Sequence, residues 1–220
     1  MINMDWTGFR GITHAMDTQI LSIYDIRGLE AALNVLTNGG VAAFPTDTVY
    51  GLGAMAFDES AVTMLYDVKE RRLEKAIPLL IGDFSQLERV TVGVTPMAEK
   101  LAARFWPGPL TIILPRHPSI PQAVTSLSTV GVRIPDFGPT QDLLRLTGPL
   151  AVTSANISGQ ASPSTSPDVE AQLGGRIPLI LDGGATPGGT ASTVVDCTKS
   201  HPVILREGPI SLEEILQALA

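Results

Sequence analysis

The feature that most limits how this chain can fold is a regular alternation between short apolar runs and segments with helical spacing. Pro or Gly bounds most of the apolar runs, as is typical of buried strands. The segments between them carry apolar residues three or four positions apart, which indicates amphipathic helices. Because strands that alternate with helices build α/β domains, we expect a single α/β domain with a twisted, mostly open mixed sheet flanked by helices.

The same pattern gives each expected element a place on the sequence. We expect strands over residues 19–25, 41–44, 77–81, 110–114, 130–134, 150–153, 179–181, 193–198 and 203–206. We expect helices over residues 27–38, 59–69, 96–106, 140–146 and 167–173. The capping box Ser211–Glu214 opens a last helix, 211–220, which we expect to pack on the domain formed by residues 20–210. Residues 1–19 show no period and predict an irregular N-terminal lead.

Composition narrows the class of function. The 220 residues hold 15 Lys and Arg against 22 Asp and Glu, which gives a net charge of −7. This balance disfavours a broad basic face for duplex nucleic acid, although it is compatible with a local basic pocket. The single cysteine, Cys197, excludes an internal disulfide, and the histidines show no zinc-binding spacing. No secretory signal or membrane-length apolar run is visible, so we expect a cytoplasmic protein with no membrane partner.

Polar groups follow four of the expected strands. Residues 45–53 follow one strand, Arg133 lies at the end of another, residues 153–156 follow a third, and Arg206 ends the last. Ligands of open α/β sheets bind beyond strand ends, so these groups predict one shared site. Taken singly, each segment is also compatible with an ordinary turn, where Ser, Thr, Asn and Gly are common.

A basic cluster lies at residues 69–75 and holds four of the 15 basic residues. If the helix over 59–69 ends there and the chain then straightens, Lys69 and Arg71 point to the same side. Two cationic side chains that point to the same side in an acidic protein favour a polyphosphate ligand. The alternatives are a solvated charge run, or cations that do no more than stabilise a helix C-terminus.

Two glycine-rich segments approach nucleotide-binding motifs without satisfying them. Residues 51–56 fit the loose GxGxxG/A pattern, but they lie several residues past the strand and open no clear helix. Residues 183–190 lack the GK[ST] ending of a phosphate-binding loop. The chain also has no GxSxG elbow. These patterns argue against a Rossmann dehydrogenase, a P-loop NTPase and a serine hydrolase.

Seven segments in a fixed order carry a family resemblance: PTDTVYGLG (45–53), KxR (69–71), FWPGPLT (105–111), VGVRIP (130–135), SANxSG (154–159), STVVD (192–196) and RxG (206–208). Together they resemble the YrdC-like family, whose members are L-threonylcarbamoyladenylate synthases. The similarity runs from residue 20 to residue 208, and the chain looks like the short, single-domain form of the family.

The resemblance implies a nucleotidyltransferase. L-Threonine, bicarbonate and ATP, with Mg²⁺, give threonylcarbamoyladenylate and pyrophosphate, and a partner complex transfers the threonylcarbamoyl group to tRNA. Carried over by motif position, the catalytic residues are Lys69 and Arg71. The resemblance assigns threonine to Thr48, Arg133, Ser154 and Ser192. It assigns the nucleotide, its phosphates or the bicarbonate to Lys69, Arg71, Lys75, Thr129, Asn156, Ser164 and Arg206, and it names no metal ligand from the protein.

Two other functions stay open. An RNA-binding module without its own chemistry would bind tRNA weakly and in a salt-dependent way, which the acidic composition disfavours. A nucleotide-binding paralogue with a different carbamoyl-type substrate is the third hypothesis. It is motivated by Arg72, which stands where family members usually have proline, and by Ala76 and Ile77, which precede Pro78 as two extra residues.

Overall fold

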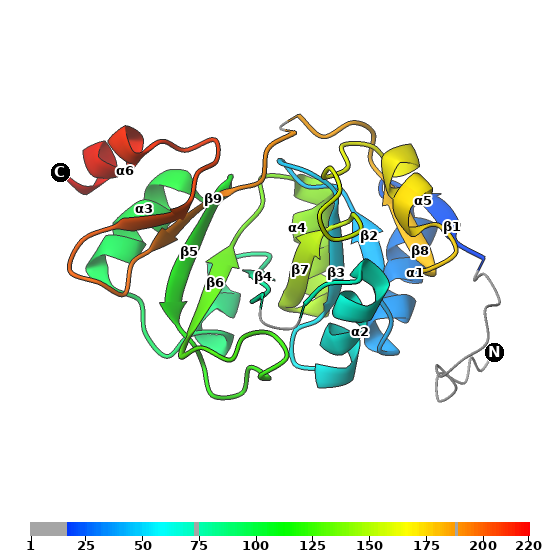
Figure 1. The fold of residues 1–220 in the computed structure, drawn as a ribbon, viewed down its shortest axis with the longest axis horizontal. Coiled ribbons are helices and arrows are strands. Elements are labelled where there is room, and N and C mark those ends of the chain that lie inside the picture. The colour runs from blue at the N-terminus through cyan, green and yellow to red at the C-terminus, as the bar shows by residue number, and fades with distance from the viewer. Residues whose placement is uncertain (1–16, 73–74, 188) are drawn as a thin grey trace.

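The computed structural model describes residues 17–72, 75–187 and 189–220 (Figure 1). Its strands are β1 (Gln19–Ser22), β2 (Ala42–Phe44), β3 (Gly51–Met55), β4 (Leu79–Leu80), β5 (Leu110–Pro115), β6 (Thr129–Arg133), β7 (Leu150–Ser154), β8 (Leu179–Asp182), β9 (Thr193–Asp196) and β10 (Val203–Arg206). Its helices are α1 (Ile26–Thr37), α2 (Glu59–Lys69), α3 (Pro96–Phe105), α4 (Gly138–Thr147), α5 (Ser166–Leu173) and α6 (Leu212–Leu219), with a short 3₁₀ helix, η1 (Phe84–Arg89). Within these ranges, no helix is both long and apolar enough to cross a membrane.

In the described part of the chain, ten strands form one sheet in the order β1-β8-β2-β3-β7-β4-β6-β5-β9-β10. Parallel and antiparallel neighbours both occur, since β1 pairs with β8 in parallel whereas β3 pairs antiparallel with β2 and β7. The sheet is open because β1 and β10 are its two edges. The expected α/β domain with an open mixed sheet flanked by helices is confirmed.

Every strand and helix expected from the sequence is present, with bounds that differ by a few residues, whereas β3 and η1 are missed. The sequence of β3 has two glycines and no β-branched residue, so it lacks a strand pattern. It becomes a strand because β2 and β7 pair with it on either side. Of the irregular lead expected over residues 1–19, residues 1–16 lie outside the described residues, and Gln19 already begins β1.

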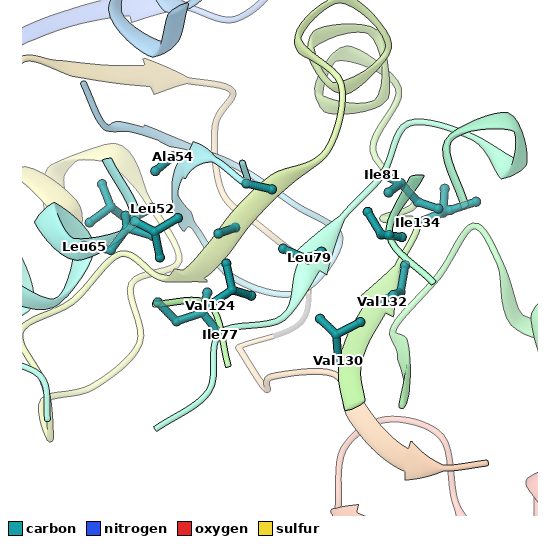
Figure 2. Close-up of a cluster of buried hydrophobic side chains, with 14 of the residues drawn as sticks. Leu52, Ala54, Leu65, Ile77, Leu79, Ile81, Val124, Val130, Val132 and Ile134 are labelled. Carbon is teal, nitrogen blue, oxygen red and sulfur yellow. The ribbon is translucent and has the colours of Figure 1, made fainter. Parts of the chain in front are cut away.

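The sheet buries side chains on both faces, because successive residues of a strand point to opposite sides. On β2, Ala43 belongs to the core that packs against α2, α3, α5 and α6, whereas Phe44 belongs to the core that packs against α1 and α4. Figure 2 shows part of the first core, where alternate residues of three strands, among them Leu52, Leu79 and Val132, point to the same side. The domain therefore has helices on both faces of the sheet.

Helices α1 and α4 lie side by side on one face of the sheet. Helix α1 covers one end of this face by packing on β1, β8, β2 and β3. At the other end, α3 packs on β5 from the opposite face. Thr111 of β5 and Arg133 of β6 alternate with Ile112 and Val132, which belong to the core on the α3 side. The side chains of Thr111 and Arg133 therefore point to the α1/α4 face, beyond the strands on which α1 packs.

Helix α2, which leads into the basic cluster, begins and ends at the residues that the sequence pattern predicts. The Asp58 side chain caps it by accepting hydrogen bonds from the backbone N–H groups of Ser60 and Ala61, each at 3.0 Å. The helix ends at Lys69, and Glu70 then takes a left-handed φ of 53°. Non-glycine residues rarely adopt this conformation. It turns the chain sharply, so the expected straightening after Lys69 does not occur.

The C-terminal helix α6 begins with the capping box that the sequence predicts. Ser211 accepts a hydrogen bond from the backbone N–H of Glu214 at 3.2 Å, and its own backbone N–H donates to the Glu214 carboxylate at 2.8 Å. Ile215 is fully buried in the core that also contains α3, and α6 packs against α3 at the same end of the molecule (Figure 1).

Candidate active site

A cavity of about 230 Å³ opens on the α1/α4 face, next to the strands that α1 covers. Its apolar lining includes Pro78, Leu80 and Val152. Many of the residues expected at the site also line it: Thr48, Arg71, Arg133, Ser154, Ser192 and Arg206. Among the described residues, this lining contains arginines and hydroxyl side chains but no carboxylate.

Strand register brings these residues together from distant parts of the chain. The start of β5, the end of β6, the start of β9 and the end of β10 lie at the same end of the sheet. Across the cavity, β3 and β7 set Gly51 opposite Ser154, and the loop between β2 and β3 carries Thr48. Because Val152 in the middle of β7 also lines the cavity, the site extends over a face of the sheet, whereas the sequence pointed to a crevice beyond strand ends.

Arg133 is enclosed at the end of β6 and is only 5% exposed. Its Nε donates to the carbonyl of Gly108 at 2.9 Å, its Nη1 donates to Thr48 Oγ1 at 3.1 Å, and its Nη2 forms an ion pair with Asp47. Burial lowers the pKa of the guanidinium, Asp47 opposes this shift, and Arg206 adds to it. A guanidinium has more N–H groups than these contacts use, so Arg133 can also bind an anion in the cavity.

Asp47 is the counter-ion of Arg133, and its side chain is 10% exposed. One carboxylate oxygen, Oδ1, contacts Arg133, whereas the other, Oδ2, is buried without a hydrogen-bond partner among the described residues. A buried carboxylate depends on its paired cation, because an unpaired charge in the interior is costly. Asp47 and Arg133 therefore form a fixed unit that contacts Thr48.

Arg206, at the end of β10, also lines the cavity and bonds to the start of β9. Its Nη2 donates to the backbone carbonyl of Ser192 at 2.7 Å and to Ser192 Oγ at 3.0 Å, while its Nε donates to the same carbonyl at 3.0 Å. Ser192 Oγ also lies 2.8 Å from Thr111 Oγ1. Burial, followed by the nearby charge of Arg71, lowers the pKa of Arg206.

Arg71 lines the cavity beside Arg206, and no acidic side chain pairs with it in the described residues. Its Nη2 donates to the carbonyls of Lys75 and Ala76 at 3.3 and 3.1 Å, and its Nε is buried without a partner in that part of the chain. Burial lowers the pKa of Arg71. Arg71 and Arg206 thus add positive charge to the cavity without a paired acid.

Lys69, in contrast, does not line the cavity and is 1% exposed. Its Nζ donates to the backbone carbonyls of Ser154 and Asn156. Burial, with a smaller contribution from Arg71, lowers the pKa of Lys69 to about 7. The chain turns at Glu70 between the two cations, and Arg71 lines the cavity whereas Lys69 bonds to the residues that follow β7.

The other residues expected at the nucleotide also lie outside the cavity lining. Asn156 is buried, and its side-chain amide donates to neighbouring backbone carbonyls at 2.8 Å. Ser164 contacts the Asp168 carboxylate, and Lys75 is exposed. Thr129 begins β6, at the opposite end of the strand from the cavity. The structure therefore brings all the residues expected at threonine to one cavity. Of the residues expected at the nucleotide, Arg71 and Arg206 line the same cavity.

Sequence reasoning missed three residues of the site, although all lie in motif segments. Asp47 is the one acidic residue in PTDTVYGLG and lies between two threonines. Its position in this motif could have indicated a counter-ion for the arginine expected at a strand end. Thr46 Oγ1 donates to the carbonyl of Val49 at 2.7 Å and so shapes the loop that presents Thr48. Thr111, from FWPGPLT, gave no signal beyond its place in the motif.

The site does not offer a set of metal ligands. No group of three or more His, Cys, Asp or Glu side chains suited to a metal ion occurs among the described residues. Mg²⁺ prefers oxygen ligands such as carboxylates, phosphates and water. The residues present therefore do not fit a protein-held Mg²⁺, and an ion that arrives with a nucleotide would take its ligands from phosphates and water.

Comparison with known proteins identifies relatives of the chain. The family model Sua5_yciO_yrdC, described as "Telomere recombination", matches residues 34–208. Threonylcarbamoyl-AMP synthase of Pyrococcus abyssi is 43% identical over 189 residues, which are 85% of this chain and 56% of that protein. The protein of the same name from Bacillus subtilis is 43% identical over 201 residues, which are 90% of this chain and 58% of that protein. The chain thus spans little more than half the length of these two relatives.

Solved structures of relatives have the same fold. The structure of P. abyssi Sua5 complexed with L-threonine has a TM-score of 0.89 and 40% identity, and the match covers 92% of this chain and 61% of that chain. Escherichia coli YciO has a TM-score of 0.80 and 27% identity, and the match covers 90% and 99% of the two chains. Motifs, sheet and relatives all agree with the YrdC-like resemblance, and the chain belongs to the Sua5/YciO/YrdC family.

Proposed function

We propose that this chain is an L-threonylcarbamoyladenylate synthase, a nucleotidyltransferase that joins L-threonine, bicarbonate and ATP and releases pyrophosphate. The observation that supports this most is the meeting of three arginines with the hydroxyls of Thr48, Ser154 and Ser192 around one cavity. Two relatives are named threonylcarbamoyl-AMP synthase, and one relative was solved with L-threonine bound.

The charge of the cavity fits these substrates. ATP, bicarbonate and the carboxylate of threonine are anions, whereas the chain has a net charge of −7. Arg71, Arg133 and Arg206 concentrate positive charge at the cavity, and Asp47 offsets one of them. A local field of this sign attracts anionic substrates to one place on a protein whose net charge is negative.

The chemistry needs two bond-forming steps. The amine of threonine attacks the carbon of bicarbonate, and water leaves as a carbamate forms. If the carbon dioxide in equilibrium with bicarbonate reacts instead, the amine nitrogen loses a proton and no water leaves. A carbamate oxygen then attacks the α-phosphorus of ATP, and the bond from that phosphorus to the bridging oxygen breaks, so that pyrophosphate leaves with the electron pair. Holding the reactants aligned can supply about 7–11 kcal/mol of the barrier.

Neither step requires a covalent nucleophile from the protein. The one cysteine, Cys197, is buried, and burial raises the pKa of its thiol to about 12, so it is not a thiolate at neutral pH. The work of the site is positioning and charge stabilisation. Mg²⁺ would enter as part of the ATP substrate, and we assign no protein ligand to it.

We assign threonine to one side of the cavity and the phosphates to the other. Arg133 would bind the carboxylate, and the hydroxyls of Thr48, Ser154 and Ser192 would orient the rest of the amino acid. Arg71 and Arg206 would face the phosphates, where charge develops during transfer. Of the other residues expected at the nucleotide, Lys75, Thr129, Asn156 and Ser164, we propose no direct contact with ATP.

The product also implies a setting. An acyl-adenylate is a reactive mixed anhydride, so a second protein should take it up soon after release. We propose that this partner is a complex that transfers the threonylcarbamoyl group to tRNA. We also propose that the reaction occurs in the cytoplasm, where ATP and tRNA are available.

The test is pyrophosphate release from ATP by the full chain, with threonine and bicarbonate omitted in turn. We expect release only when both are present, together with a product that has the mass of threonylcarbamoyladenylate. Release without threonine would replace the proposal with a paralogue that uses another substrate. Salt-dependent tRNA binding without any release would replace it with an RNA-binding module.

A further inference from the structure

Lys69 directs its side chain to the turn that follows β7. The Nζ atom donates to the backbone carbonyls of Ser154 and Asn156, and it lies 3.5 Å from Asn156 Oδ1. A lysine ammonium has three N–H donors and no acceptor. The acceptors of this single turn therefore occupy the donors of Lys69, and the side chain is 1% exposed.

The backbone of Lys69 holds the same turn from a second point. Its carbonyl accepts a hydrogen bond from the backbone N–H of Ser158 at 2.8 Å. Lys69 thus contacts both the beginning and the end of residues 154–158. The turn starts at Ser154, which is the last residue of β7 and lines the cavity.

These contacts assign Lys69 a role that differs from binding a phosphate. Given the proposed function, on which this inference rests, we propose that Lys69 is a positioning residue that holds Ser154 on the cavity wall and so acts on threonine binding through Ser154. To reach a phosphate, Nζ would have to leave the carbonyls of Ser154 and Asn156. Buried carbonyls that lose their donors are costly to leave unpaired.

The protonation state of Lys69 is compatible with this role. Burial, and then the charge of Arg71, lower the pKa of Lys69 to about 7. A neutral amine still has two N–H groups, which is enough for the two carbonyls. Positioning therefore persists in both protonation states, whereas attraction of a phosphate needs the charged form.

A double-mutant cycle tests the proposal. The variants are Lys69→Met, Ser154→Ala and the two combined, and the measurements are KM for threonine, KM for ATP and kcat in pyrophosphate release. We expect each single variant to raise KM for threonine about tenfold, the loss expected for about 1.4 kcal/mol. We expect the double variant to match Ser154→Ala, because residues that act through one another are not additive. The ATP KM should change less than twofold.

A direct role on ATP gives the opposite result and would overturn the proposal. In that case Lys69→Met raises the ATP KM more than the threonine KM, and its effect multiplies with that of Ser154→Ala. The matched control is Lys100→Met, because Lys100 is an exposed lysine that also donates to a backbone carbonyl, that of Leu219 at 3.0 Å. Its kinetic constants should equal those of the wild type.

Lys69→Gln keeps N–H donors and serves if Lys69→Met does not fold. Calorimetric titration of Lys69→Gln with L-threonine and with ATP should show weaker binding of threonine and unchanged binding of ATP. Amide hydrogen exchange over residues 154–160 should be faster than in the wild type. These readouts need no turnover, so they remain informative if pyrophosphate release proves independent of threonine. Faster exchange with unchanged threonine affinity would overturn the positioning role.

Discussion

The two sides of the cavity hold their arginines in different ways. On one side, Arg133 is enclosed and has its own counter-ion, Asp47. On the other, Arg71 and Arg206 bond to backbone carbonyls, with Ser192 Oγ in addition for Arg206. Neither has an acidic partner among the described residues.

This difference suggests separate roles for the arginines, one in orienting a substrate and the other in attracting anions. A buried ion pair has a fixed geometry, so the Arg133 side suits the orientation of a small amino acid. Arginines without a paired acid keep their full attraction for anions, so the Arg71 side suits phosphates. Substitution of Arg133 should therefore affect folding as well as activity, whereas substitution of Arg71 should affect activity alone.

The largest effect on stability is expected from Arg133→Met. This change leaves the buried carboxylate of Asp47 without its cation, and such a loss costs about 3–5 kcal/mol. Urea denaturation measures the free energy of unfolding. The double variant Arg133→Met with Asp47→Leu is the control, and we expect it to recover most of the loss, because the uncompensated charge is gone. A loss below about 1 kcal/mol in Arg133→Met would show that the pair is not a structural unit.

Arg71→Met should have a smaller effect than Arg133→Met, and this effect should be on activity. A charge-assisted hydrogen bond contributes about 1.5–3 kcal/mol, so kcat/KM for ATP should fall roughly tenfold to a hundredfold. The free energy of unfolding should stay within about 0.5 kcal/mol of the wild type. Arg72→Met is the matched control, since Arg72 is exposed and does not line the cavity. If both variants lose activity equally, the loss reflects general charge and not the site.

Substrate analogues examine the Arg133 side without any mutation. Valine has a methyl group in place of the hydroxyl of threonine, so it cannot make the hydrogen bond that a site built for this hydroxyl offers, and it should be strongly rejected. Serine lacks only a methyl group, worth about 1–3 kcal/mol, so it should be a weak substrate. Competition assays that monitor each adenylate by mass measure the ratios. Equal rates with valine and threonine would contradict the assignment of Thr48, Ser154 and Ser192.

The smallest effect concerns Lys69 and pH. Its pKa is about 7 in the folded protein and 10.5 without perturbation, so between these values the unfolded chain binds more protons than the folded one. The free energy of unfolding should therefore rise with pH above about 7, by about 1 kcal/mol over the first pH unit, because Lys69 loses its proton in the folded protein first. This gain should be lost as the pH falls back to 7. The difference in unfolding free energy between wild type and Lys69→Met, measured at several pH values, isolates it. A difference that does not change with pH would contradict the lowered pKa.

The sequence predicted the elements that depend on local pattern. The helix ending at Lys69 was placed correctly because its spacing is regular, and the capping box at Ser211 was visible in four residues. The strand beginning at Gly51 was missed because pairing with two neighbours creates it and its own residues do not favour it. Local sequence pattern thus suffices to predict a helix or strand that does not depend on long-range contacts.

The site was predicted in part for the same reason. Motif order identified Arg133, Ser154 and Ser192, which the structure brings to one cavity. The position of Arg71 relative to Lys69 could not be read from the motif, because it depends on the left-handed conformation of Glu70. The pairing of Asp47 with Arg133 depends on contact between residues far apart in the sequence.

A crystal structure of the full chain with L-threonine and a non-hydrolysable ATP analogue tests the two-sided cavity. We expect the carboxylate of threonine on Arg133, the phosphates on Arg71 and Arg206, and Lys69 still bonded to the turn after β7. Nucleotide bound on another surface, or threonine seated away from Arg133, would contradict the assignment of the cavity.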